Sequence, residues 1–465
     1  MILCNKNYLY QCQKIFLWNS YAIIMKWTKK FQKSYIKDYS NQILTLTKKI
    51  IVEILAKIEK IKELRIIKDE PELIITFPVS LIFIILIVWL KPIFRIRVGF
   101  LKNDRIGHFA ANTELYLCEK NQRQDKSLDL LYLPRKNTCN RALLKIISRK
   151  IIILPKIVLR PICLIFRSFS FFKSFRCGIT LNEDRDISNL MDGTESILKL
   201  SHEEEKIGYQ YLERLGLNRS SKFICLTVRD ELYLARLNGD ARVSSYHNHR
   251  NADISNYIEA LKKLTERGYY IFRMGVIVKD KLEINHPKII DYAFNGHRTE
   301  LLDIFLGANC HFCISTSTGF DAIPYIFRRP IVYTNLCPIG LFFTFSKNYL
   351  MIPKHHYSEK KNAALSFKEI VEFKLATETS SENFSAKNVK LIQNSSEEIL
   401  DVVLEMDDTL TIGTGNRTEE GEERQRIFWS KFPVDAVAAN DKRLHGRIVS
   451  RIGDKFLKEN EYFLK

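Results

Sequence analysis

The chain has 465 residues, more than one ordinary hydrophobic core accommodates, so we expect two α/β domains and an additional segment. A hydrophobic content of 46%, with only 18 glycines and 12 prolines, excludes a disordered or low-complexity chain. The net charge of +19 is uneven: by count, residues 1–200 contain 35 Lys and Arg against 17 Asp and Glu, whereas the remainder is nearly balanced. We therefore expect the first half of the chain to bind an anionic partner, either nucleic acid or a membrane surface.

An uncharged run, LIITFPVSLIFIILIVWL, occupies residues 73–90, after an amphipathic stretch at 43–67. As a helix its eighteen residues reach about 27 Å, at the short end of a bilayer span. Trp89 and Lys91 give one end an interfacial character. The run is thus a candidate membrane anchor, either a full span or a shallow re-entrant segment, and a buried helix of a large domain is the alternative. This apolar content favours a membrane surface over nucleic acid as the anionic partner.

The next segment has the pattern that opens a nucleotide-binding fold. A strand is predicted at 94–100, then a polar turn, a small-residue helix start at 106–115 and a second strand at 128–133. Residues 144–175 are both basic and apolar. They predict either a lipid-facing flank of this first domain or strands interrupted by two prolines.

The second half predicts a parallel sheet. A buried strand at 222–229 precedes a helix that Asp253 caps and Gly268 ends, and a strand at 269–273 completes a βαβ unit. The pattern then repeats with helices and strands at 299–306, 311–314, 320–327, 330–333, 366–373 and 396–406. The tail is expected to fold back over the first domain as a closing helix. The fold class is therefore α/β, with two Rossmann-like doubly wound domains and a helical, membrane-associated N-terminal extension.

Four segments follow from these boundaries. They are a helical extension at 1–92 containing the anchor candidate at 73–90, an N-terminal Rossmann-like domain at 93–212, a C-terminal Rossmann-like domain at 213–410, and a tail with its closing helix at 411–465.

The ten cysteines show no disulfide spacing, and the CxxC at 310–313 has no second pair to complete a zinc site. We therefore predict core thiols in a reducing compartment.

Ligands of parallel sheets bind at the carboxyl ends of the strands. The turn at 315–319, STSTG, directly follows a strand and precedes a helix, so its hydroxyls and backbone N–H groups would suit a diphosphate. Hydroxyl-rich turns also serve plain helix capping, which is the alternative for these residues.

Three arginines lie at or just past strand ends: Arg229, Arg250 and Arg273. Guanidinium groups bind phosphate oxygens in a bidentate manner, so these arginines are candidate ligands of the phosphates of a bound nucleotide. The alternative is that each pairs with a nearby carboxylate, such as Asp230 or Asp253.

The first domain offers candidates for a general base, a side chain that removes a proton from a reacting hydroxyl. His108 follows a glycine at a helix start, and a histidine suits this chemistry near neutral pH. Asp104 and Glu114 are the other candidates, and a histidine that only caps the turn is the alternative.

Four blocks carry a family resemblance: RIGHFAANTELYLCE (105–119), YHNHRNADISNYIEALKKLTERGYYIFRMG (246–275), FCISTSTGFDAIPYIFRRPIVYTN (312–335) and HGRIVSRIGDKFL (445–457). They resemble a bacterial family of glycosyltransferases associated with surface-polysaccharide gene regions. The resemblance spans roughly residues 95–460 and implies a GT-B-like fold whose C-terminal domain binds a nucleotide-sugar donor. It also implies donor contacts from Ser315, Thr316, Ser317, Thr318 and Gly319, with Asp321 as a weaker candidate for a donor hydroxyl.

Together these observations predict a glycosyltransferase that moves a sugar from a nucleotide sugar to a glycan or lipid-linked surface-polysaccharide acceptor, such as that of a lipopolysaccharide O-antigen. No DxD motif follows a strand, so we expect a metal-independent reaction without a cofactor. The expected partners include an anionic membrane surface but no nucleic acid, and the expected location is the cytoplasmic face of a bacterial inner membrane. The alternatives are a sugar-nucleotide epimerase on the same fold and a non-catalytic membrane-associated scaffold.

Overall fold

The computed structural model describes residues 72–124, 126–178, 185–238, 248–414, 417–435 and 446–465. The predicted amphipathic stretch at 43–67 lies outside these residues. The chain forms two compact units, and each contains several separate stretches of sequence. Unit 1 contains residues 1–101, 124–136 and 151–178, and unit 2 contains residues 102–123, 137–150 and 179–465. The four predicted segment boundaries remain predictions.

Unit 1 is a small parallel sheet with helices on it. The strands are β1 (Ile96–Phe100), β2 (Leu128–Tyr132) and β3 (Ile152–Ile153), in the order β1-β2-β3. The helices are α4 (Glu72–Leu90), α7 (Lys156–Ser168) and the 3₁₀ helix η1 (Ser170–Phe175). A buried, bidentate ion pair joins Arg97 of β1 to Asp129 of β2, with both distances 2.7 Å. The two predicted strands of this region are confirmed.

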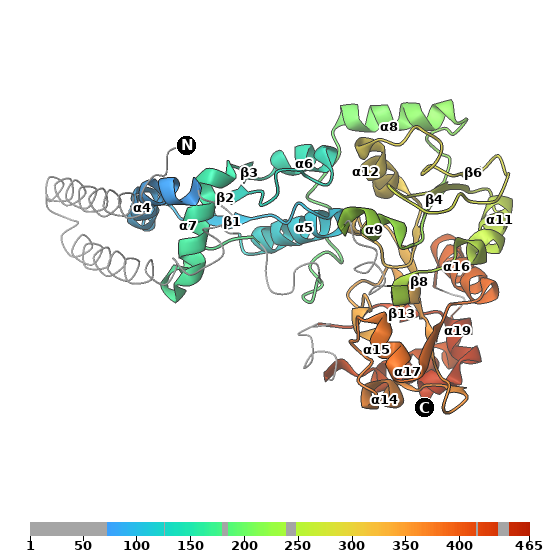
Figure 1. Cartoon of the computed structure of the whole chain (residues 1–465). Coiled ribbons are helices and arrows are strands. Elements are labelled where there is room, and N and C mark those ends of the chain that lie inside the picture. Colours follow the sequence, from blue (N-terminus) through green and yellow to red (C-terminus); the bar gives the residue numbers. More distant parts are fainter. Residues whose placement is uncertain (1–71, 125, 179–184, 239–247, 415–416, 436–445) are drawn as a thin grey trace, which may run out of the picture. The chain divides into compact units, whose positions relative to one another are not determined.

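The predicted helix over residues 73–90 is present as α4. Leu81, Ile84, Ile87 and Val88 are buried in the core of unit 1, where α7 packs against α4 (Figure 1). Over the residues described, no helix combines the length and the apolar character that crossing a bilayer requires.

Interrupted strands are not what residues 144–175 form. Most of this stretch is helical, because α7 continues through Pro161, which lies only five residues after the helix begins at Lys156. The apolar residues of α7 lie at helical spacing, and Leu159, Ile162, Cys163 and Phe166 are buried against α4 and the sheet. Helical periodicity therefore overrides the strand propensity of the isoleucines.

Unit 2 is built on a seven-stranded parallel sheet in the order β13-β9-β8-β7-β4-β5-β6. The strands are β4 (Phe223–Thr227), β5 (Tyr270–Arg273), β6 (Ile289–Ile290), β7 (Cys313–Ser315), β8 (Ile331–Leu336), β9 (Tyr349–Pro353) and β13 (Arg451–Ile452). The chain winds outward from β4 in one direction and from β7 in the other, as a doubly wound sheet does. Mixed α/β structure with parallel sheets is thus confirmed. A small antiparallel sheet is added by β10 (His355–Ser358), β11 (Ala363–Ala364) and β12 (Val389–Ile392).

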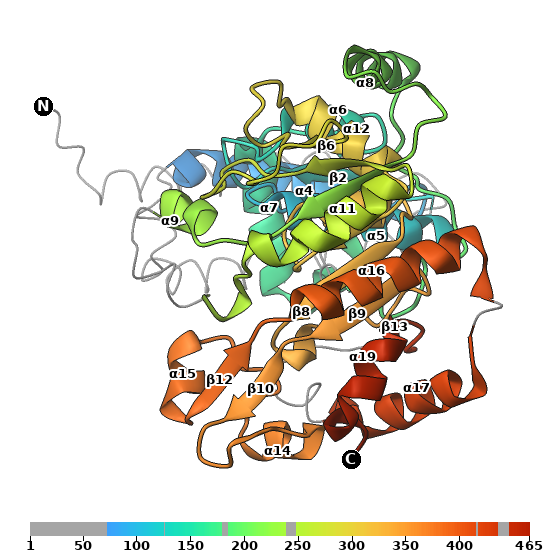
Figure 2. The same cartoon turned by 90° about the vertical axis from the view of Figure 1, so that its right-hand side faces the viewer.

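Helices cover both faces of this sheet. On one face α11 (Ile258–Glu266) and α16 (Ser396–Thr411) lie side by side (Figure 2). On the other side α12 (Glu300–Asn309) and α13 (Ala322–Ile326) pack against each other. Helix α5 (Ile106–Gln122) packs on α13, while α6 (Arg141–Ser148) and α8 (His202–Arg214) pack on α12. The shorter helices of this unit are α9 (Leu232–Asn238), η2 (Asn248–Arg250), η3 (Ile254–Tyr257), η4 (Ile339–Leu341), α14 (Phe367–Glu372) and α15 (Ser381–Ala386). Asp253 caps η3 by accepting from the N–H of Ser255, as the sequence predicts for the start of this helical segment.

The described part of the tail belongs to unit 2, where Asn189 donates to the carbonyl oxygen of Arg447 at 3.3 Å. Its predicted closure over the first domain stays a prediction. The tail forms α17 (Glu419–Lys431), α19 (Asp454–Glu459) and η6 (Glu461–Leu464), while β13 pairs with β9 at the edge of the seven-stranded sheet. Helix α19 packs on α16 and α17, so the tail completes unit 2. The unpaired edge of β9 explains this placement, because a strand edge with free N–H and C=O groups pairs with another strand.

The described cysteines are free thiols. Cys225, Cys310 and Cys313 are fully buried in unit 2, and burial raises the pKa of Cys225 and Cys313 well above the ordinary value. The prediction of core thiols is confirmed for these residues.

Candidate functional site

The site lies where the winding direction of the sheet reverses, between β4 and β7. These strands are direct neighbours, with Thr227 opposite Ser315 at their carboxyl ends. The connections after these two strands lead away in opposite directions. In doubly wound sheets, ligands bind in the crevice that forms at such a point, outside the carboxyl ends of the strands. The segments that follow are Val228-Arg229 after β4 and the turn at 316–319 after β7.

The turn at 316–319 is held by its own side chains. Asp321 accepts a hydrogen bond from the Ser315 hydroxyl at 2.7 Å and one from the Thr318 N–H at 2.9 Å. The Ser317 N–H donates to the Ser315 hydroxyl oxygen at 3.1 Å. The N–H groups of Ser317 and Thr318 are thus engaged within the turn, and α13 is a single short turn of helix. Asp321, which was predicted to contact a donor hydroxyl, is buried and holds the shape of this turn.

The turn is also tied to the neighbouring strand end. Thr316 Oγ1 accepts from the Arg229 N–H at 2.8 Å, and the hydroxyls of Thr318 and Thr227 are 3.1 Å apart. These hydroxyls therefore fix the two loops relative to each other. Ser317 has φ = 61°, a left-handed conformation that residues other than glycine seldom adopt.

Arg250 binds this strained serine. Its Nη2 donates to the Ser317 carbonyl oxygen at 2.8 Å and to the Ser317 hydroxyl at 3.1 Å. Arg250 comes from η2, far from the turn in sequence, so the fold brings together two of the predicted donor ligands.

Arg229 is a partly buried cation beside other cations. Burial, together with the neighbouring charges of Arg250 and Arg105, lowers the pKa of Arg229 from 12.5 to about 9. The opposing effect of Asp230 on this pKa is smaller, and the Asp230 carboxylate accepts from the backbone N–H groups of Leu232 and Lys279. The Nε of Arg229 is buried and has no hydrogen-bond partner. Since buried cations are normally paired, this arrangement is what a site for an anion requires.

The amino end of α5 lies beside the same turn. A Cβ added to Gly107 would come within 3.3 Å of the Gly319 Cα, so the two backbones approach closely. Arg105 is the N-cap residue of α5, and its side chain makes no capping hydrogen bond. The first turn of a seventeen-residue helix carries unpaired N–H groups and a partial positive charge, which adds to that of the arginines.

Two of the three predicted bases lie near this helix end. His108 is in the first turn of α5 and is partly buried, whereas Asp104 is exposed just before the helix. Glu114 is fully buried further along α5, where it accepts from Arg328 and from the N–H groups of Ile197 and Leu198. These contacts give Glu114 a structural role.

Arg273 is likewise engaged in the fold. It is buried at the end of β5, where it contacts the Asp291 carboxylate at 3.1 Å and donates to the Asp280 carbonyl oxygen at 2.9 Å. Arg273 therefore pairs with a carboxylate, whereas among the described residues no carboxylate lies within ion-pair distance of Arg229.

Two cations of this edge were not predicted from the sequence. Arg105 directly precedes the helix start predicted at 106–115, but nothing in the local sequence shows that this helix meets the turn at Gly319. Lys354, directly after β9, is buried and donates to the carbonyl oxygen of Asn251, the residue after Arg250. Burial lowers the pKa of Lys354 to about 8.

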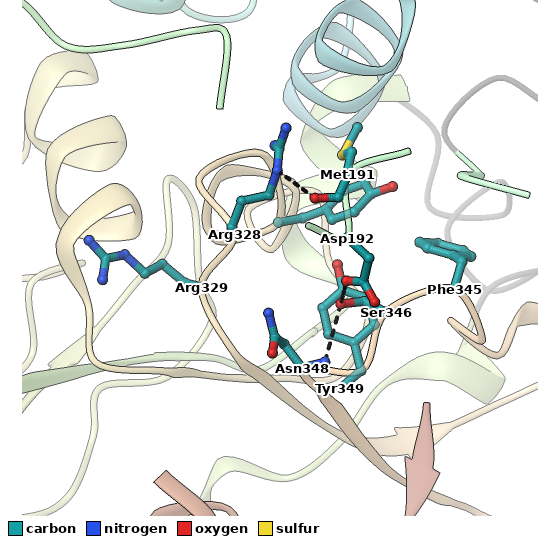
Figure 3. Close-up of a pocket in the computed structure, with 9 residues that line it drawn as sticks. Met191, Asp192, Arg328, Arg329, Phe345, Ser346, Asn348 and Tyr349 are labelled. Atoms are coloured by element: carbon teal, nitrogen blue, oxygen red, sulfur yellow. Dashed lines mark hydrogen bonds between the residues drawn. The ribbon is translucent and has the colours of Figure 1, made fainter. Parts of the chain in front are cut away.

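A separate small cavity lies next to the end of α13 and the residues that directly follow it (Figure 3). Its volume is about 10 Å³, enough for about one water molecule. Its polar groups bond to one another: Asp192 accepts from the Ser346 hydroxyl at 2.8 Å, and Arg328 donates to the Met191 carbonyl oxygen at 3.1 Å. This cavity is therefore a packing feature and not the ligand site.

The chain is thus a doubly wound α/β protein with neighbouring arginine side chains at the point where the winding direction of its larger sheet reverses. No protein-family model matches the chain, and no curated protein matches it. Among solved structures it is similar to the ADP-heptose LPS heptosyltransferase II of E. coli, with 12% identity, 67% of this chain and 100% of that chain covered, and a TM-score of 0.38. A glycosyl transferase family 9 protein from Veillonella parvula gives 9% identity, 67% and 97% coverage, and a TM-score of 0.41. The dodecameric iron-containing heptosyltransferase TibC in complex with ADP-D-beta-D-heptose has 12% identity, with 68% of this chain and 77% of that chain covered and a TM-score of 0.34. Likeness this remote carries no assignment of activity, which has to come from the residues of the site.

Proposed function

We propose that this chain is a glycosyltransferase that binds the diphosphate of a nucleotide sugar between the carboxyl ends of β4 and β7. The observation that supports this is the group of guanidinium cations, Arg229, Arg250 and Arg105, beside the amino end of α5. A diphosphate has the charge and the several oxygen acceptors that such a group satisfies.

The same arrangement suits the chemistry of glycosyl transfer. As the bond between the sugar C1 and the phosphate oxygen breaks, negative charge grows on the leaving diphosphate. Arginines and a helix amino end held near the diphosphate would stabilise that charge as it forms. The acceptor hydroxyl loses its proton as its oxygen bonds to C1, and His108 or Asp104 at the start of α5 would accept it.

Donor binding is tested by thermal unfolding of the full chain with ADP-, UDP-, GDP-, CMP- and dTDP-linked sugars, free nucleotides and pyrophosphate. A ligand that binds only the folded state at about 100 times its Kd adds about 2.7 kcal/mol to the free energy of unfolding. We expect one nucleotide class to raise the Tm, and we expect Ser317→Trp with Thr318→Trp to remove the increase. The matched control is Arg426→Met on α17, an exposed arginine in unit 2 that should leave the increase unchanged.

Catalysis is tested separately with the nucleotide sugar that binds. A glycosyltransferase releases the nucleoside diphosphate when a glycan acceptor is added, whereas an epimerase changes the sugar while it stays on the nucleotide. Absence of a Tm increase with every nucleotide, from a folded sample, would refute the proposed donor site. Binding without release in the presence of acceptors would support the non-catalytic alternative.

A further inference from the structure

Unit 1 has an exposed apolar surface that its own core does not use. On α4 the side chains of Val79, Ile82, Phe83, Leu86 and Leu90 are each more than a third exposed. Their spacing places them on one side of the helix, opposite the buried Leu81, Ile84, Ile87 and Val88. Ile93, which is 85% exposed, and Phe94 extend the same row beyond the end of the helix. We call these seven exposed residues the α4 apolar face.

This face is comparable in size to the largest apolar patch of a typical soluble monomer, which is often a functional surface. Seven aliphatic and aromatic side chains at these exposed fractions present on the order of 500 Å² of apolar area. Single exposed apolar residues need no explanation, but a continuous row of this extent marks a surface that binds something.

The charge around the face identifies the kind of partner. Lys91 and Arg95 are exposed at its carboxyl end, beside Ile93 and Phe94. Residues 151–178, which supply α7 and η1 of the same unit, contain five Lys and Arg and no Asp or Glu. A second copy of this surface would bring like charges together, which is unfavourable, whereas an anionic surface would be attracted.

The apolar face also lacks the polar groups that a specific protein interface uses at its rim. Its side chains are Val, Ile, Leu and Phe only, with cations at one end. This is the composition of a helix that lies in the plane of a bilayer, with its apolar side among the acyl chains and its cations at the headgroups. The other side of α4 is committed to the core of unit 1, so half of the helix is available to lipid.

We propose that the α4 apolar face is a docking surface for an anionic lipid bilayer, which holds unit 1 at the membrane with α4 lying in the interface. The proposal is independent of the nucleotide-sugar site, because that site consists of residues of unit 2.

The test is co-sedimentation of the full chain with vesicles of phosphatidylcholine, with and without phosphatidylglycerol. We expect binding to the mixed vesicles that weakens as salt is added, because salt screens the cations. Lys91→Gln with Arg95→Gln should lower the partition coefficient about 25-fold, at about fivefold for each cation near an anionic surface. Phe83→Glu with Leu86→Glu should lower it by about tenfold or more.

The matched control is Ile207→Glu with Ile412→Glu, which places the same charges on exposed apolar positions of unit 2. It should leave the partition coefficient unchanged, and circular dichroism melting should show that all variants are folded. No binding by the wild-type chain would overturn the proposal, as would binding by the Phe83→Glu, Leu86→Glu variant equal to that of the wild type. A wild-type oligomer that this variant converts to monomers, without vesicle binding, would instead identify a second copy as the partner.

Discussion

Replacing Arg229 with methionine removes a partly buried cation while it keeps a side chain of similar length. Burial and the charges of Arg250 and Arg105 lower the pKa of Arg229 from 12.5 to about 9. That difference corresponds to roughly 4–5 kcal/mol of cost for the charged form, which is the form present at pH 7. Relaxation of solvent and side chains returns part of this cost. We therefore expect Arg229→Met to raise the free energy of unfolding of the ligand-free protein by about 1–2 kcal/mol.

The same substitution should weaken donor binding. A hydrogen bond to a charged group is worth about 1.5–3 kcal/mol, so losing one to a phosphate raises the Kd by about 10- to 150-fold. Stability and affinity thus change in opposite directions. That combination distinguishes a binding residue from a structural one, because removing a structural residue lowers both.

The measurements are urea unfolding without ligand and calorimetric titration with the nucleoside diphosphate. The pH dependence has a definite sign: the cost of the charge is present below about pH 9 and is relieved as the pH rises from about 9 toward 12.5. The stability difference between the variant and the wild type should therefore narrow above about pH 9. Arg426→Met is the matched control and should change neither quantity. A ligand-free Arg229→Met protein that is less stable than the wild type, or that binds equally well, would refute the reasoning.

Three further predictions concern other parts of unit 2. His108→Ala should lower kcat by about 10²- to 10⁴-fold while the donor Kd stays within about twofold, and an unchanged kcat would exclude His108 as the base. Glu114→Gln leaves the guanidinium of Arg328 buried without its counter-charge, so urea unfolding should show a loss of about 3 kcal/mol; a variant as stable as the wild type would contradict this. Burial lowers the pKa of His356 to about 4 from an unfolded value of 6.5, so the unfolded chain binds the proton first as the pH falls. The free energy of unfolding should therefore drop by about 3 kcal/mol between about pH 6.5 and pH 4, and His356→Gln should flatten this dependence in urea midpoints measured across the range.

Much of the fold of unit 2 could be predicted because its signals are local. The helical segment after Asp253 has a capping side chain at its start, apolar residues at helical spacing and a glycine just past its end, and the strands at either side are short apolar runs. The prediction of interrupted strands at 144–175 failed because β-branched residues favour strands and prolines usually interrupt a helix. The helix α7 forms because its apolar side chains at helical spacing reach the core of unit 1.

The site was partly predictable for a similar reason. A strand-end arginine is visible in sequence, but whether it is paired depends on distant residues: Asp291 pairs with Arg273, and Asp230 is occupied by backbone N–H groups beside Arg229. The inward hydrogen bonds of the turn at 316–319 also escape sequence reasoning, because a hydroxyl in a turn can face a ligand or its own loop. Placing Arg105 at the site depends on the contact between Gly107 and Gly319, which are more than two hundred residues apart in sequence and cannot be paired from sequence alone.

The division into two units has a practical consequence for how this protein can be taken apart. The chain passes from one unit to the other after Leu101, Arg123, Lys136, Lys150 and Gly178. No single cut in the polypeptide therefore separates them, and a truncation at any of these points leaves part of one unit's interior on the wrong fragment. Expression of either half alone should give insoluble or protease-sensitive material. For the same reason, exchange of a donor-binding half between related chains by one recombination event would not preserve α5, which comes from the first third of the sequence and belongs to the second unit.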